Sequence, residues 1–149
     1  MSSDDPTSGD ELGSGDATGP DPSILPLGTL GLVAPMNSLG FALNPGIGIV
    51  YDEVVVLLPA QTLVFTYQQH RALDAARRLP YDEAAGKHGI RVFRLSDIER
   101  AELVRPFTGY RLLLDVGEHH ERWILQKPDV DEVRRCLSKV LGDRFVDSV

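Results

Sequence analysis

The fold is decided by the stretch Tyr110-Arg-Leu-Leu-Leu-Asp-Val-Gly117, which continues as Glu118-His-His-Glu-Arg-Trp-Ile-Leu-Gln-Lys127. Alternating apolar residues predict two strands, and Gly117 supplies a tight turn between them. Leu113 interrupts the polar side of the first strand, which predicts partial cover on both of its faces. In the second strand Trp123 and Leu125 share one face, while Ile124 points to the other. The stretch therefore predicts a β-hairpin.

A helix is expected directly after this hairpin, over residues 129–141. Asp129 is placed to cap it, and Glu132 at the third helical position completes a capping box. Gly142 follows as a stop signal. The apolar residues recur at three- and four-residue spacing, as Val130, Val133, Cys136, Leu137, Val140 and Leu141. One such stripe predicts an amphipathic helix that packs its apolar face on a sheet.

Shorter apolar runs upstream predict further strands. Residues 54–58 and 62–67 are rich in β-branched and aromatic residues, and their spacing predicts a hairpin. Residues 90–95 and 101–106 alternate, with a turn expected over residues 96–100. Together these elements predict a mainly β (α+β) fold.

Residues 22–51 contain no charged side chain. Pro26, Pro35 and Pro45, together with five glycines in the same segment, argue against a membrane-spanning helix, because proline and glycine both weaken helices. Two readings remain for this uncharged segment. It supplies short buried strands and loops that cover the core, which we favour, or it forms an exposed apolar surface that docks on a partner or a second subunit.

The net charge of −7 belongs to the N-terminus. Six acidic and no basic residues lie within residues 1–23, whereas residues 24–149 carry 16 acidic and 15 basic residues. A polar acidic segment predicts disorder over residues 1–23, followed by one domain over residues 24–146. The nearly balanced domain argues against a nucleic-acid partner.

A cytoplasmic protein without membrane contact is expected. The N-terminus has neither the basic residues nor the apolar core of a signal peptide, and the single Cys136 cannot form an internal disulfide. Twelve of the 15 basic residues are arginine, which favours a bacterial source with a GC-rich genome.

The densest group of basic residues lies in residues 68–89, where an inserted helix and loop interrupt the strand pattern. It comprises Arg71, Arg77, Arg78 and Lys87, which could meet a phosphate or an acidic partner segment. A solvated surface is the simpler interpretation. These four residues are the candidate ligand-binding or partner-binding site.

No motif indicates catalysis, a metal or a cofactor. His119 and His120 are adjacent in a strand, so their side chains point to opposite faces and cannot easily share an ion. Cys136 lies on the apolar stripe of the helix and is expected to be packing.

Over residues 54–145 the chain resembles the bacterial pleckstrin-homology-like domains. The resemblance is carried by Ile90-Arg-Val-Phe-Arg-Leu-Ser-Asp-Ile-Glu-Arg-Ala-Glu-Leu103, then Arg111-Leu-Leu-Leu-Asp-Val-Gly117, Trp123-Ile-Leu125 and the helix over residues 130–141. It implies an antiparallel, partly open β-barrel of about seven strands, capped by the C-terminal amphipathic helix.

Three functional hypotheses follow. The first is a non-enzymatic binding or scaffold module that mediates protein–protein interaction or self-association, through a sheet edge or the uncharged segment. The second is a small-ligand-binding protein or enzyme with a site between the 68–89 loop and the barrel mouth. The third, with least support, is an export-chaperone or immunity-type protein whose acidic tail meets a basic partner.

Overall fold

The computed structural model describes residues 20–59 and 66–149 of the 149-residue chain. The strands are β1 (Gly28–Pro35), β2 (Gly46–Val50), β3 (Val54–Pro59), β4 (Arg91–Arg94), β5 (Ile98–Val104), β6 (Arg111–Val116), β7 (His119–Ile124) and β8 (Phe145–Asp147). The helices are α1 (Thr66–Ala76), α2 (Tyr81–Ala85) and α3 (Val130–Leu141). None of the helices in the described part of the chain is long and apolar enough to cross a membrane.

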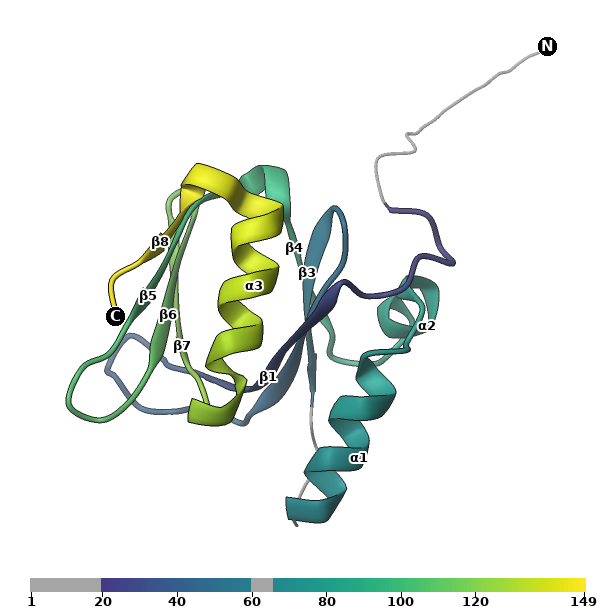
Figure 1. Ribbon diagram of the computed structural model, residues 1–149, viewed down its shortest axis with the longest axis horizontal. Helices are drawn as coiled ribbons and strands as arrows, with labels where there is room; N and C mark the ends of the chain where they lie inside the picture. The colour runs from purple at the N-terminus through teal and green to yellow at the C-terminus, as the bar shows by residue number, and fades with distance from the viewer. Residues whose placement is uncertain (1–19, 60–65) are drawn as a thin grey trace.

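The strands form one mixed sheet in the order β4-β3-β2-β1-β7-β6-β5-β8, which is not closed into a barrel. All neighbours are antiparallel except β5 and β8, which are parallel. Figure 1 shows two arms of the sheet that meet at β1, with α3 lying in the angle between them. The prediction of a mainly β fold with a C-terminal helix is confirmed, whereas the parallel strand β8 was not expected.

The hairpin predicted over residues 110–127 is confirmed. Strands β6 and β7 are paired from Arg111↔Ile124 to Val116↔His119, and Gly117 turns with a φ of 63°. Trp123 is fully buried, in line with its predicted face. Strand β5 is connected to β6 by a turn that contains Gly109, so β5, β6 and β7 form an antiparallel meander.

Helix α3 begins and ends where the sequence predicts, but the predicted capping box does not form. Asp129 makes no capping hydrogen bond, and its carboxylate instead accepts one from the backbone of Leu32 in β1. Glu132 accepts a hydrogen bond from the backbone N–H of Thr29 at 2.7 Å. These two carboxylates therefore join α3 to β1, because they accept hydrogen bonds from the backbone N–H groups of β1 and not from those of the helix itself.

Strand β1 has glycines at two positions where α3 packs against it. A Cβ atom on Gly28 would lie 2.3 Å from the sulfur of Cys136, and one on Gly31 would lie 2.0 Å from Oδ2 of Asp129. Gly31 also has a φ of 75°, which disfavours other residues. These glycines allow the helix to approach the strand closely.

The uncharged segment supplies strands that are buried on both faces. Every residue of β2 is buried. One side of this arm belongs to an inner core, where Leu30 and Val55 pack with Trp123 and α3. The other side belongs to an outer core, which joins Ile47, Ile49, Tyr51, Val54 and Val56 with Ala76 and Ala84. The favoured interpretation of residues 22–51 is confirmed for β1 and β2, since a charge on either face would be desolvated.

Helices α1 and α2 cover the outer core, and here two predictions fail. Residues 66 and 67 lie in α1 and not in a strand, while residues 62–65 lie outside the described residues. Strand β3 pairs with β2 and β4, so the predicted hairpin of residues 54–58 and 62–67 is wrong. A loop was expected around residues 84–87, but α2 extends to Ala85, so that only residues 86 and 87 lie outside a helix. The small Ala76 and Ala84 pack on the sheet, and this packing outweighs the β propensity of Thr66 and Tyr67.

The first described residues are attached to this layer. The backbone N–H groups of Asp82 and Tyr81 donate to the carbonyls of Pro22 (2.9 Å) and Ile24 (3.0 Å). Residues 20–23, assigned from composition to the tail, thus lie against α2. Residues 1–19, which carry the rest of that prediction, lie outside the described residues.

Candidate functional site

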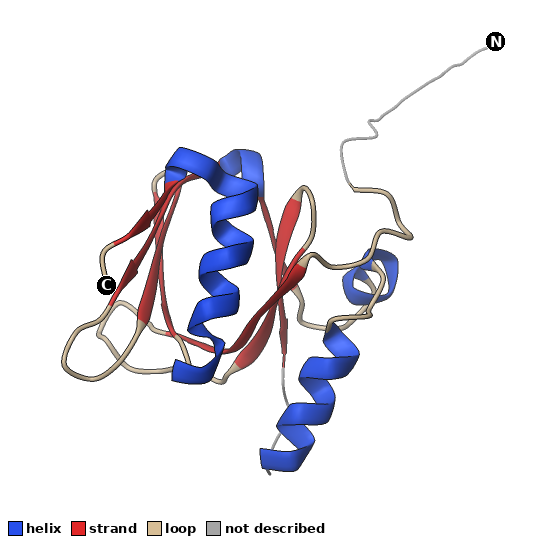
Figure 2. Ribbon diagram, in the orientation of Figure 1, coloured by secondary structure: helices blue, strands red, loops and turns tan. Residues whose placement is uncertain are grey.

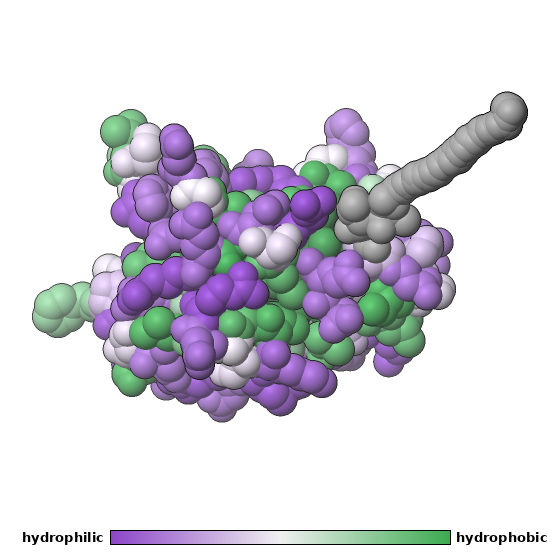
Figure 3. All heavy atoms as spheres, turned by 90° about the horizontal axis from the view of Figure 1, so that it is seen from above, coloured by the Kyte–Doolittle hydropathy of each residue, from purple (hydrophilic) through white to green (hydrophobic). Residues whose placement is uncertain are grey.

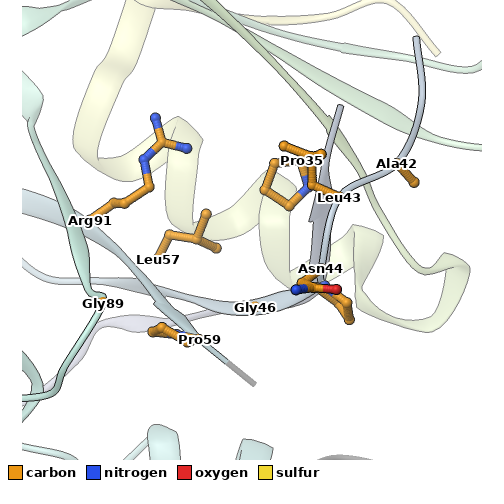
Figure 4. Close-up of a pocket in the computed structure, with 10 residues that line it drawn as sticks. Pro35, Ala42, Leu43, Asn44, Gly46, Leu57, Pro59, Gly89 and Arg91 are labelled. Atoms are coloured by element: carbon orange, nitrogen blue, oxygen red, sulfur yellow. The ribbon is translucent and has the colours of Figure 1, made fainter. Parts of the chain in front are cut away.

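A cleft of about 870 Å³ lies between the β1–β2 connection and the ends of β3 and β4. It is lined by Pro35, Ala42, Leu43, Asn44, Pro45, Gly46, Leu57, Pro59, Gly89 and Arg91. In Figure 4, Pro35 and Leu43 stand on one wall, and Leu57 and Arg91 stand on the other. Most of these residues are apolar, so the cleft is suited to an apolar group.

The β1–β2 connection, residues 36–45, carries exposed apolar side chains, and we call it the apolar loop. Leu39 is 79% exposed, Phe41 is 66% exposed and Leu43 is 51% exposed. Leu43 also lines the cleft, so the exposed side chains and the cleft form one surface. This is the part of the uncharged segment that the strands do not bury.

The apolar loop is held by a dense set of hydrogen bonds. The side-chain oxygen of Asn37 accepts from the backbone N–H groups of Leu39 (3.0 Å) and Phe41 (2.9 Å). The N–H of Asn37 donates to the carbonyl of Phe41 at 2.9 Å, and Gly40 turns with a φ of 87°. From β7, Arg122 donates to the Asn37 carbonyl at 3.1 Å. The loop therefore presents Leu39 and Phe41 in a fixed conformation.

The surface turned to the viewer in Figure 3 is different in character. It shows groups of hydrophobic residues interspersed among hydrophilic ones. Single exposed apolar residues are common on soluble proteins, whereas adjacent ones on an ordered loop indicate an interaction site.

An ion pair between the exposed Arg91 and the buried Glu121 closes one side of the cleft. The guanidinium of Arg91 in β4 donates to both oxygens of Glu121 in β7, at 3.1 and 2.8 Å. The indole N–H of Trp123 donates to Glu121 at 2.9 Å, and His119 also contacts this carboxylate. Burial raises the pKa of Glu121, but these hydrogen bonds outweigh it and hold the pKa below its ordinary value. The carboxylate is therefore ionised, and its oxygens are engaged in hydrogen bonds with Arg91, Trp123 and His119.

The four basic residues predicted as a site do not line the cleft. Arg71 and Arg78 are exposed. Arg77 pairs with Glu132 at 2.8 Å and with Asp74 at 3.2 Å, and the hydrogen bond to Glu132 raises the pKa of Arg77. Arg77 thus joins α1 to α3. Lys87 lines a second hollow of about 350 Å³ with Leu58, Pro59 and His88.

The histidine pair is arranged as the strand pattern predicts. His119 contacts Glu121 on one face, while Nδ1 of His120 lies 2.6 Å from Oδ1 of Asp115 on the other. Within residues 20–59 and 66–149 no three His, Cys, Asp or Glu side chains gather in a way that could hold a metal ion. Cys136 is fully buried in the inner core, and burial raises its pKa. Its role in packing is confirmed.

Sequence reasoning did not identify the cleft, Arg91 or Glu121. Strand periodicity contains a signal for Glu121, since it lies two residues before Trp123 and therefore on the same buried face. The absence of charge in residues 22–51 left an exposed apolar surface as the less favoured alternative, without indicating which residues would form it. No known protein-family model matches the chain, and a search of curated proteins found no similar sequence.

Proposed function

We propose that the protein is a non-enzymatic binding module that uses the apolar loop to bind a protein surface. The observation that supports this is the exposure of Leu39 and Phe41 on a loop that hydrogen bonds hold in place. Burying one such side chain on binding gains about 1.5–3 kcal/mol. A fixed loop loses little conformational entropy when it binds, so most of that gain is retained.

The sheet edges are less suitable as a binding surface. The edge strands are β4, with four residues, and β8, with three. Arg91 and Arg94 flank β4, and charged residues on short edge strands oppose pairing with another chain. Of the two surfaces considered for a protein partner, we therefore favour the apolar loop.

A small apolar ligand is the second candidate. The cleft falls within the 300–1,000 Å³ that is typical of ligand pockets. Arg91 is the one ionisable side chain among the residues described as lining the cleft, and its guanidinium is already hydrogen-bonded to Glu121. The lining favours apolar contact over acid–base chemistry.

We also propose that the domain is a pleckstrin-homology-like, partly open barrel. In support, β4 and β7 are not neighbours in the sheet, yet Arg91 reaches Glu121 and the ring of Phe93 packs edge-on against Trp123 at 5.5 Å. These contacts require the two arms to bend toward each other. Helix α3 packs against the inner core at this bend (Figure 2).

Photo-cross-linking in the source organism tests the binding function. Benzoylphenylalanine is placed at position 41 of the full chain, and at the exposed Phe107 in a control protein. Irradiation is expected to yield a discrete protein adduct from position 41, identified by mass spectrometry, and no such adduct from position 107. Equal or absent cross-linking at both positions would show that the apolar loop binds no protein.

A further inference from the structure

We infer that the protein bound by the apolar loop is a second copy of this chain, with Phe41 of each copy inserted into the cleft of the other. The inference rests on the proposed binding function and assigns its partner. Three properties of the surface support it. The projecting side chains lie next to the cleft, the segment carries no charge, and the loop is ordered before it binds.

The projecting side chains and the cleft lie next to each other on the chain. Phe41 projects into solvent, and the following residues Ala42 and Leu43 form a wall of the cleft. A two-fold axis beside the loop therefore brings Phe41 of each copy to the cleft of the other. Such an interface is self-complementary and closes after two copies.

The charge distribution favours a surface that meets itself. In a two-fold interface a charged residue close to the axis faces the same residue of the other copy, and this repulsion destabilises the complex. No charged residue lies between residues 22 and 51. The nearby arginines are occupied within their own chain, because Arg91 binds Glu121 and Arg122 donates to the Asn37 carbonyl.

The size and rigidity of the surface are also suitable. A buried phenylalanine removes about 150–250 Å² from water. Each copy contributes Phe41 with Leu39 and Leu43 as the apolar centre, and a stable interface of standard size buries about 800 Å² per partner. The hydrogen bonds of Asn37 fix the loop before association, so ordering it adds little cost.

Sedimentation equilibrium of the full chain tests this dimer. The wild type is expected to form a reversible dimer. The variants Leu39→Ser and Phe41→Ser are each expected to weaken dimerisation about 30-fold, the effect of a central interface residue. The matched control Phe107→Ser removes an apolar side chain that is more exposed but outside the loop, and it is expected to leave the dimer unchanged. Circular dichroism confirms that each variant is folded.

Cross-link mapping tests the geometry. In a mixture of 15N-labelled and unlabelled protein with benzoylphenylalanine at position 41, cross-links between copies are expected at residues that line the cleft, such as Leu57 or Arg91. A wild type that remains monomeric at millimolar concentration, or a Phe41→Ser variant that still dimerises, overturns the inference. If position 41 then cross-links only a different protein in cells, the binding function stands and the second copy is excluded as partner.

Discussion

At the scale of single residues, the burial of Glu121 could not be expected from its charged and exposed neighbours in the sequence. Glu121 lies between the exposed His120 and Arg122 in a charged run, yet it is almost wholly buried. A carboxylate in that position is stable only with hydrogen-bond donors around it, and Arg91, Trp123 and His119 surround it. Glu121 therefore links β4 to β7 at the edge of the cleft.

The variant Glu121→Gln is expected to lower the free energy of unfolding by about 1–3 kcal/mol at neutral pH, since it weakens charge-assisted hydrogen bonds. The pKa of Glu121 lies below its ordinary value of 4.5 in the folded protein, so the unfolded chain takes up this proton first as pH falls. The stabilisation is complete above about pH 4.5 and is lost as pH falls through the folded pKa. Urea unfolding at several pH values should show the difference from wild type shrinking in acid. The exposed Glu118→Gln serves as control, and a difference that stays constant with pH would contradict the assignment.

At the scale of elements, local signals predicted β6, β7 and α3 because each has a clear hydrophobic period and its own stop residue. The failures occur where tertiary contacts outweigh local preference. Asp129 and Glu132 have the spacing of a capping box, yet both carboxylates bind β1. Residues 62–67 have strand composition, yet α1 begins at Thr66 to cover the outer core.

The close approach of α3 to β1 predicts a large difference between two glycines with similar backbone angles. Gly31 and Gly40 have φ values of 75° and 87°, so alanine at either position costs about 1–2 kcal/mol in backbone strain. A Cβ atom at Gly31 also overlaps Asp129, whereas one at Gly40 has no atom within 4 Å. Gly31→Ala is therefore expected to destabilise the protein by about 1–3 kcal/mol more than Gly40→Ala, by overpacking. Thermal unfolding of both variants measures this, and equal losses would mean that α3 does not lie against β1.

At the scale of the whole molecule, the cleft could not be predicted because its residues come from three distant segments. Leu43, Leu57 and Arg91 meet only through the order of β2, β3 and β4 in the sheet. The same arm separates the two cores, and its strands β1, β2 and β3 contribute residues to both. The lack of charge in residues 22–51 follows from this double burial, while the exposed loop within it carries the proposed function.

Because β2 and β3 belong to both cores, we expect the domain to unfold as one cooperative unit. Ile49 lies in the outer core, and Trp123, the only tryptophan, lies in the inner core. Ile49→Ala should destabilise the protein by about 2–5 kcal/mol, because it leaves a cavity in a packed region. If the cores are coupled, the denaturation midpoint from Trp123 fluorescence must fall together with the midpoint from far-UV circular dichroism. If the cores unfolded independently, the fluorescence midpoint of the variant would stay at its wild-type value, because the loss of stability at Ile49 would not affect the inner core around Trp123.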